Sequence, residues 1–148
     1  IVHYHNRSKL NLEKEQGSIY HDSLKSLMEV SDVFSVCCPA SKETINVINK
    51  ETLEYLPKGA VVTNVARGDI IDDEALIDAL DRRKVYAVGL DVYKGEPKLN
   101  PGYLKHKSAF ILPHLGSATK DTRTAMANLA IDNLEEFFKT GSCKNKVN

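Results

Sequence analysis

Short apolar runs alternate with helical patterns along the 148-residue chain. The runs at 32–38, 60–66 and 86–92 have the length of a strand and lack the polar alternation of a half-exposed one, so each is predicted to be a β-strand buried on both faces. Between the last two, residues 72–85 form a helical pattern with an acidic first turn and a basic last turn. Strands and helices that alternate in this way form right-handed βαβ units, which predicts an α/β fold with a doubly wound parallel sheet.

Weaker patterns predict two further strands, at 1–4 and 109–113, and two further helices, at 22–32 and 49–59. Asp22 or Ser23 is the expected N-cap of the first of these helices. A long helix is predicted from Thr119 to Phe138, with Gly141 as its end. Its apolar side chains are expected to face inward: Met126, Leu129, Ala130, Leu134, Phe137 and Phe138.

Composition excludes several classes of function. The formal net charge is zero, which gives no reason to expect a nucleic acid or an anionic membrane as partner. The three cysteines fit no disulfide framework and form no Cys-x-x-Cys pair, so neither a disulfide scaffold nor a metal site is expected. Without a signal peptide or a run long enough to span a membrane, the chain is expected to be cytoplasmic.

Charged side chains follow the predicted strands at the edge where ligands bind in parallel α/β sheets. They are Arg67, Asp91, Glu96 and His114. Each has an ordinary structural alternative: a carbonyl cap or a surface ion pair for Arg67, a turn or N-cap residue for Asp91, a solvated turn for Glu96, and a hydrogen-bonded core histidine for His114. Independent structural roles would scatter such residues, so their convergence on one edge favours a functional site.

This set of side chains suits one type of chemistry. A histidine beside a carboxylate stays protonated near neutral pH and acts as a general acid or base. A nearby guanidinium binds a substrate carboxylate with two parallel hydrogen bonds. Together these groups would anchor a 2-oxo acid and protonate its carbonyl oxygen, while another component attacks the carbonyl carbon.

Three motifs carry a family resemblance: NVARGDIIDDEALIDAL at 64–80, GLDVYKGEP at 89–97 and PHLGSAT at 113–119. In this order they resemble the NAD(P)-binding domain of the D-2-hydroxyacid dehydrogenases, from Ile1 to about Gly141. The resemblance is closest to the glyoxylate/hydroxypyruvate reductase branch. It implies a Rossmann-like fold and hydride transfer between a nicotinamide cofactor and a small 2-oxo acid such as glyoxylate or hydroxypyruvate.

The resemblance also implies roles for single residues. Arg67 corresponds to the substrate-binding arginine, Glu96 to the carboxylate that tunes the histidine, and His114 to the acid/base. The positions that correspond to cofactor contacts are Cys38, Pro39, Thr44, Val65, Ala66, Asp91, His114, Gly116 and Ser117.

The chain departs from the family pattern in two places. Cys37 stands where the family commonly has a histidine, and Cys37 and Cys38 are interpreted as packing residues that face the cofactor rather than as nucleophiles. A strand followed by G-x-G-x-x-G, expected before Ile1, does not occur, nor does the family's substrate domain. We therefore expect residues 1–141 to be the C-terminal part of the NAD(P)-binding domain, truncated before its second strand, with a tail at 142–148. The long helix would return to the absent substrate domain, and a homodimer is expected at full length.

The basic cluster after the first predicted strand bears on the cofactor. An enzyme that prefers NAD usually has an acidic residue there for the ribose 2′-hydroxyl. Asn6, Arg7 and Ser8 instead offer hydrogen-bond donors to a 2′-phosphate, which favours NADP over NAD. The alternative for these residues is a solvated basic turn.

Other readings of the whole chain stay open at this point. Formate dehydrogenase shares the fold, but that family has a glutamine where Glu96 stands. A dinucleotide-sensing corepressor can keep the arginine, glutamate and histidine. An inactive fragment is the third alternative.

Overall fold

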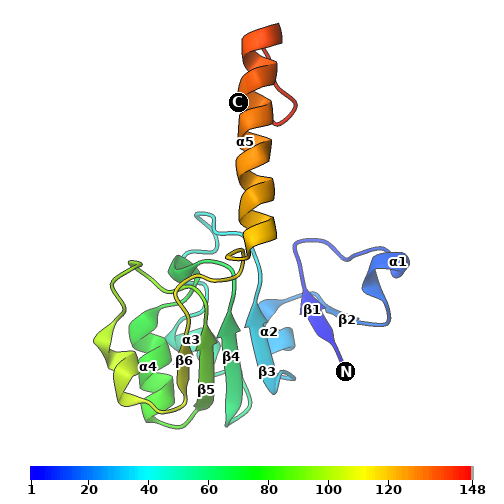
Figure 1. The fold of residues 1–148 in the computed structure, drawn as a ribbon. Coiled ribbons are helices and arrows are strands. Elements are labelled where there is room, and N and C mark those ends of the chain that lie inside the picture. The colour runs from blue at the N-terminus through cyan, green and yellow to red at the C-terminus, as the bar shows by residue number, and fades with distance from the viewer. Residues whose placement is uncertain (148) are drawn as a thin grey trace. The chain divides into compact units, whose positions relative to one another are not determined.

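The computed structural model describes residues 1–147 and divides into two compact units, Ile1–Pro113 and a second that begins at His114. Figure 1 shows the strands and short helices of the first unit and the long helix of the second.

A four-stranded parallel sheet forms the centre of the first unit. Its strands lie in the order β3 (Val33–Val36), β4 (Ala60–Asn64), β5 (Val85–Leu90) and β6 (Ala109–Ile111). All four were predicted from the apolar runs, and each is one to three residues shorter than its run. The prediction that β3 and β5 are buried on both faces is wrong, because Val33 and Tyr86 are 66% and 71% exposed. The α/β class with parallel strands is confirmed.

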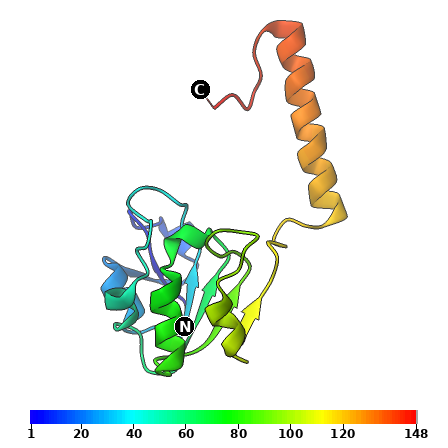
Figure 2. The ribbon, with the colours of Figure 1, turned by 90° about the vertical axis from the view of Figure 1, so that its left-hand side faces the viewer.

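Three helices pack side by side along one face of this sheet (Figure 2). They are α2 (Leu24–Met28), α3 (Lys50–Leu53) and α4 (Asp73–Asp81). This arrangement follows from topology, because right-handed crossovers that all proceed in one direction along a sheet place their helices on the same side. Under these helices lie the buried residues of the strands, such as Phe34, Val62 and Val88, each at most 5% exposed.

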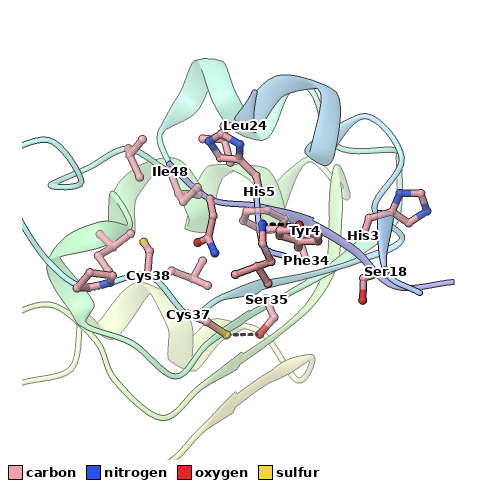
Figure 3. A pocket seen from close by; sticks show the side chains of 16 residues that line it. His3, Tyr4, His5, Ser18, Leu24, Phe34, Ser35, Cys37, Cys38 and Ile48 are labelled. Carbon is pink, nitrogen blue, oxygen red and sulfur yellow. Dashed lines mark hydrogen bonds between the residues drawn. The ribbon is translucent and has the colours of Figure 1, made fainter. Parts of the chain in front are cut away.

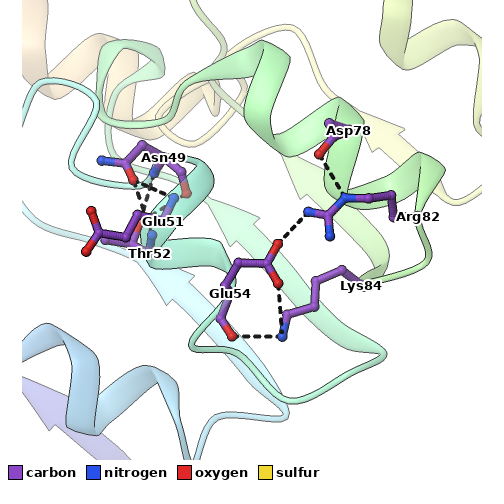
Figure 4. Close-up of polar contacts among 7 residues, drawn as sticks. All are labelled: Asn49, Glu51, Thr52, Glu54, Asp78, Arg82 and Lys84. Atoms are coloured by element: carbon purple, nitrogen blue, oxygen red, sulfur yellow. Dashed lines mark hydrogen bonds and ion pairs between the residues drawn. The ribbon is translucent and has the colours of Figure 1, made fainter.

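The helices begin where the sequence offers a polar cap. Ser23 caps α2, which decides between the two predicted caps. Asn49 caps α3, and its side chain accepts from the backbone N–H of Thr52 while the Thr52 hydroxyl accepts from the N–H of Asn49 (Figure 4). Asp72 caps α4 through the N–H of Ala75.

An ion-pair network fastens α3 to α4 and to the start of β5 (Figure 4). The guanidinium of Arg82 contacts the carboxylates of both Glu54 and Asp78. Lys84 donates from Nζ to the backbone carbonyl of Glu54 at 2.8 Å and lies 3.8 Å from its carboxylate. The basic residues Arg82, Arg83 and Lys84, which were predicted to form the last turn of a helix at 72–85, lie just beyond α4, because α4 ends at Asp81.

Tyr103 anchors the short 3-10 helix η2 (Pro101–Lys105) against the N-terminus of α4. Its side chain is 1% exposed, and its hydroxyl donates to Oδ1 of Asp73 at 2.8 Å. Burial raises the pKa of Tyr103 and also raises the pKa of Asp73, although the hydrogen bond from Tyr103 opposes the second effect.

A second, two-stranded parallel sheet precedes the main one. It pairs β1 (His3–His5) with β2 (Ile19–His21), and a short helix, α1 (Leu12–Glu15), lies between them in the chain. Nδ1 of His3 and Nε2 of His21 are 2.8 Å apart. The predicted first strand is confirmed with its bounds shifted, whereas β2 and α1 were not predicted because three or four residues are too few for a periodicity.

The second unit contains α5 (Lys120–Thr140), capped by Thr119 and ended by Gly141, whose φ is 78°. No residue of α5 is buried, and Met126, Leu134 and Phe138 are 58%, 58% and 82% exposed. The expectation that its apolar side chains face inward is therefore wrong for this chain. The unit has no other helix or strand among its described residues that could cover this face.

No helix among residues 1–147 is long and apolar enough to cross a membrane. The predicted division into 1–141 and a tail stays a prediction, and residue 148 of that tail lies outside the described residues.

Candidate functional site

The loop after β4 presents Arg67. Asn64, the last residue of the strand, is 1% exposed, and its side-chain amide bridges this loop. Its Oδ1 accepts from the N–H of Ala66 at 3.0 Å, and its Nδ2 donates to the carbonyl of Arg67 at 2.9 Å. The Arg67 side chain is exposed, with Nη1 donating to the carbonyl of Ala66. The buried side chain of Asn64 therefore fixes the backbone on both sides of the exposed Arg67 side chain.

Gly68 joins this loop to the loop after β5. A Cβ at Gly68 would lie 2.1 Å from the carbonyl carbon of Tyr93 and 2.4 Å from the backbone nitrogen of Lys94. Both contacts are with backbone, which cannot move aside as the end of a side chain can. Only glycine permits this approach, so the loop that carries Arg67 and the segment that leads to Glu96 form one packed corner.

The loop after β5 is shaped by two hydrogen bonds. Asp91 donates its N–H to the carbonyl of Asn64 at 3.0 Å, which continues the pairing of β4 and β5 beyond Leu90. Oε1 of Glu96 accepts from the N–H of Tyr93 at 3.1 Å, so the Glu96 carboxylate closes its own turn. These contacts bring the loops of Arg67, Asp91 and Glu96 together, whereas the convergence of all four residues, His114 included, stays a prediction.

A cavity of about 500 Å³ lies at the carboxyl ends of β1 and β3 (Figure 3). It is lined by His5 and Asn6 from the end of β1 and by Cys37, Cys38 and Pro39 after β3. Apolar side chains form much of the remaining wall, including Leu24, Phe34, Val36, Val47, Ile48 and Ile70, and His3, Tyr4, Ser18 and Ser35 also line it. Three of the predicted cofactor residues, Asn6, Cys38 and Pro39, thus share one cavity.

The loop from Pro39 to Thr44 borders this cavity. The Thr44 hydroxyl donates to the carbonyl of Pro39 at 3.0 Å and accepts from the N–H of Ser41 at 2.7 Å, so Thr44 has a structural role in the turn. The pKa of Glu43 is lowered, first by the hydrogen bond from the Ser41 hydroxyl and in smaller part by the charge of Arg7. Arg7, which follows β1, is therefore close enough to interact electrostatically with the carboxylate of Glu43, which follows β3.

The cysteines at this end, Cys37 and Cys38, are both exposed, so neither packs in the core, and their predicted place facing the cofactor stays a prediction. Burial of its thiol nevertheless raises the pKa of Cys38. The Sγ of Cys37 lies 3.5 Å from the hydroxyl of Ser35 (Figure 3). A raised pKa disfavours the thiolate, so Cys38 is not an activated nucleophile.

The residues at this cavity fit the nucleoside half of a dinucleotide. The volume lies in the range of small-molecule sites, and an apolar wall with a few polar groups is typical of them. Asn6 and the adjacent Arg7 and Ser8 are exposed just after β1. The sequence contributes no glycine-rich loop for the phosphates, so the fit covers the nucleoside end alone.

The other predicted residues belong to the second unit. His114 has a φ of 56°, a left-handed conformation that costs a non-glycine residue roughly 1–3 kcal/mol and is concentrated at functional sites. Leu115 accepts from the N–H of Ala118 in the turn that contains Gly116 and Ser117. Because these residues lie in a separate unit, the pairing of His114 with Glu96 stays a prediction.

Two positioning residues were missed by the sequence analysis, Asn64 and Gly68. Asn64 had a signal in the sequence, since a buried strand rarely ends in a polar amide without a hydrogen-bonding task. Val65 is 59% exposed after β4, and the structure gives no contact that distinguishes it as a cofactor residue. Among residues 1–147, no three His, Cys, Asp or Glu side chains gather as metal ligands.

Comparison with known proteins gives the chain its family. Residues 1–116 match the family described as D-isomer specific 2-hydroxyacid dehydrogenase, NAD binding domain. The glycerate dehydrogenase of Hyphomicrobium methylovorum is 40% identical over 132 residues, which are 89% of this chain and 41% of that protein.

Two solved structures are also similar. A glyoxylate reductase from Paecilomyes thermophila superposes with a TM-score of 0.90 at 40% identity, over 98% of this chain and 44% of its own. The NADPH-dependent glyoxylate/hydroxypyruvate reductase of Sinorhizobium meliloti, in complex with NADP and malonate, superposes with a TM-score of 0.89 at 34% identity. The match covers 95% of this chain and 43% of that one. The chain thus spans less than half the length of these relatives. It belongs, by its NAD-binding domain, to the D-isomer specific 2-hydroxyacid dehydrogenase family.

Proposed function

We propose that the protein containing this chain is an NAD(P)-dependent 2-hydroxyacid dehydrogenase that reduces a small 2-oxo acid such as glyoxylate or hydroxypyruvate. The observation that carries the proposal is the packed corner at Gly68, where the loop of Arg67 meets the segment leading to Glu96. The relatives named as glyoxylate reductases support the choice of substrate. When bound, the nicotinamide cofactor supplies a hydride to the carbonyl carbon of the substrate.

Arg67 binds the carboxylate of the 2-oxo acid. Its guanidinium is exposed and its backbone is held on both sides by Asn64, so the side chain projects from a fixed base. A planar guanidinium matches a carboxylate with two parallel hydrogen bonds, which orients the neighbouring carbonyl group.

His114 donates a proton to the carbonyl oxygen, and Glu96 favours the protonated imidazole. The motif match supports these two roles, and the left-handed backbone of His114 agrees with a constrained functional position. The hydrogen bond from the Tyr93 N–H orients the Glu96 carboxylate without neutralising it. The proton on the His114 imidazole would then pass to the carbonyl oxygen of the substrate.

NADP is the preferred cofactor in this proposal, with Asn6, Arg7 and Ser8 around the 2′-phosphate. The Sinorhizobium meliloti relative is an NADPH-dependent reductase, which gives independent support. Glu43 opposes this preference, because the carboxylate that Arg7 stabilises would repel a phosphate at the same place. Glu43→Gln should therefore tighten NADPH binding by a few fold and leave NADH binding unchanged, because it removes an exposed, partly screened negative charge.

Turnover by the full-length protein tests the proposal. Oxidation of NADPH with glyoxylate or hydroxypyruvate is the assay, and Arg67→Met should lower kcat/KM by about 100-fold, the loss of two charge-assisted hydrogen bonds. Arg123→Met, on the exposed side of α5, is the matched control and should leave kcat/KM unchanged. Cofactor binding without turnover of any 2-oxo acid would favour the corepressor-like alternative, and an intact rate in Arg67→Met would refute the role of Arg67.

A further inference from the structure

The segment between β1 and α1, residues 6–10, contains the basic residues Arg7 and Lys9. It leads from the end of β1 to Asn11, the N-cap of α1 (Figure 1). We call it the basic loop. Because the loop lies outside the strands and helices, its shape depends on side chains that reach it from neighbouring elements.

Two tyrosines reach the two ends of the basic loop. Tyr4 of β1 and Tyr20 of β2 are partners in the strand register, and their ring centroids are 5.3 Å apart. The Tyr4 hydroxyl accepts from the N–H of Leu10 at 3.0 Å. The Tyr20 hydroxyl donates to the carbonyl of Asn6 at 3.4 Å. The first and the last residue of the loop are thus both held by this pair of rings.

Glu15, the last residue of α1, fixes the Tyr4 hydroxyl in turn. Glu15 is 7% exposed, and its Oε1 accepts from the Tyr4 hydroxyl at 2.6 Å. A hydroxyl that donates to a carboxylate keeps its lone pairs for another donor, here the N–H of Leu10. Burial and then the hydrogen bond to Glu15 raise the pKa of Tyr4, so the hydroxyl keeps its proton at neutral pH.

Glu15 also engages one of the two cations of the loop. Nζ of Lys9 lies 3.6 Å from Oε1 of Glu15, so Lys9 helps to fasten the end of the loop to α1. The exposed residues Asn6, Arg7 and Ser8 belong to the part of the loop that precedes this attachment. They are the residues that the proposed function places around the 2′-phosphate.

We propose that Tyr4 and Tyr20 are positioning residues for cofactor selection, which hold the basic loop in the shape that binds the 2′-phosphate of NADP. This inference rests on the proposed function and deepens it. A loop that is fixed before the ligand arrives loses less conformational freedom on binding, and it therefore binds more tightly. NADH has a hydroxyl in place of the phosphate, so its binding depends less on the shape of the loop.

The geometry ranks the two tyrosines. Tyr4 makes two hydrogen bonds, at 2.6 and 3.0 Å, whereas the contact of Tyr20 is 3.4 Å long. Hydrogen bonds weaken as they lengthen, so the hydroxyl of Tyr4 should contribute more to the shape of the loop than that of Tyr20. Because neither hydroxyl is needed for the pairing of β1 with β2, removing it should leave the strands in place.

Phenylalanine variants of the full-length protein test the proposal through the dissociation constants of NADPH and NADH, measured by fluorescence titration. Tyr4→Phe removes the hydroxyl and keeps the ring beside Tyr20. It should raise the Kd of NADPH about fivefold and change that of NADH by less than about twofold, since the lost contacts are worth about one hydrogen bond. Tyr20→Phe should raise the Kd of NADPH by a smaller factor, about threefold. In both variants kcat at saturating NADPH should be unchanged, because Arg67 and His114 lie outside this loop.

Tyr86→Phe is the matched control, since it makes the same chemical change on β5, where Tyr86 is 71% exposed. It should leave both dissociation constants unchanged. Hydrogen exchange, read by mass spectrometry in peptides that cover the basic loop, should become faster in Tyr4→Phe and not in Tyr86→Phe, because the N–H of Leu10 loses its acceptor. If Tyr4→Phe fails to fold, Tyr20→Phe provides the same comparison of NADPH with NADH.

The outcomes separate this inference from the proposed function. An equal loss of NADPH and NADH binding in Tyr4→Phe would overturn the inference, because it would show a general structural role. An unchanged Kd of NADPH, or unchanged exchange in the loop, would overturn it as well. Equal affinity of the wild-type protein for NADPH and NADH would refute the NADP preference together with this inference and leave the dehydrogenase assignment intact. A wild-type protein that binds neither dinucleotide would refute the proposed function itself.

Discussion

Replacing Gly68 with alanine should open the corner that brings the Arg67 loop to the Glu96 segment. The added Cβ would meet the Tyr93 carbonyl carbon at 2.1 Å and its oxygen at 2.2 Å, where ordinary contact begins at 3.4 Å. One of the two backbones must therefore move by about 1.3 Å. Both are tied to the sheet, one through Asn64 and the other through the N–H of Asp91. Overpacking of this kind against backbone costs about 2–4 kcal/mol of unfolding free energy.

Tyrosine fluorescence during urea unfolding is a suitable measurement. The chain has six tyrosines and no tryptophan, and all six lie between Tyr4 and Tyr103, within the first unit. The signal therefore reports on that unit without a contribution from α5.

Gly89→Ala is the matched control. A Cβ at Gly89 would meet only the Cγ2 of Thr63, at 3.5 Å, which is ordinary van der Waals contact. Its cost should be within about 0.5 kcal/mol of zero, because alanine suits a strand at least as well as glycine. Equal stability of Gly68→Ala and Gly89→Ala would refute the reasoning from backbone contact.

Three further predictions concern stability and use the same unfolding assay. Asn64→Ala leaves the N–H of Ala66 and the carbonyl of Arg67 without their partner in a buried setting, and should cost about 1–3 kcal/mol; a loss below 0.5 kcal/mol would contradict the bridging role. Asp73 has a raised pKa in the folded state, so its ionisation opposes folding at neutral pH, and Asp73→Asn should be the more stable protein at pH 7. This advantage should shrink as pH falls through the folded pKa and be lost below the ordinary carboxyl value of 3.8, whereas an advantage that grew at low pH would reverse the sign. Glu54→Gln should cost no more than about 1 kcal/mol, and less in about 1 M salt, because its ion pairs are partly exposed; a salt-independent loss would point to packing instead.

The sequence was informative where one segment contains its own signal. The apolar runs of β3, β4 and β5 predicted a parallel sheet, and polar caps such as Asn49 marked where helices begin. Gly68 shows the limit, because its necessity comes from the backbone of Tyr93 in another loop. The α5 helix shows another limit. A 3.6-residue pattern identifies which face is apolar, but it does not say whether anything in the chain covers that face.

The candidate site likewise combines residues that the sequence could indicate with contacts that it could not. Arg67, Asp91 and Glu96 could be found because parallel strands bring their carboxyl ends to one edge. The role of Thr44 at the cofactor stays a prediction, whereas the contacts of its hydroxyl with Pro39 and Ser41 depend on the turn geometry and could not be predicted from the residue type.

The helices of the first unit cover one face of its main sheet, and this has a calorimetric consequence. On the opposite face, Val33 and Phe110 are 66% and 67% exposed in the folded unit. Apolar surface that is already hydrated before unfolding adds nothing to the heat-capacity change when the unit melts. Scanning calorimetry of this unit should therefore give a heat-capacity increment per residue below the usual value of about 12–15 cal/mol/K, so its stability curve should be unusually flat with temperature.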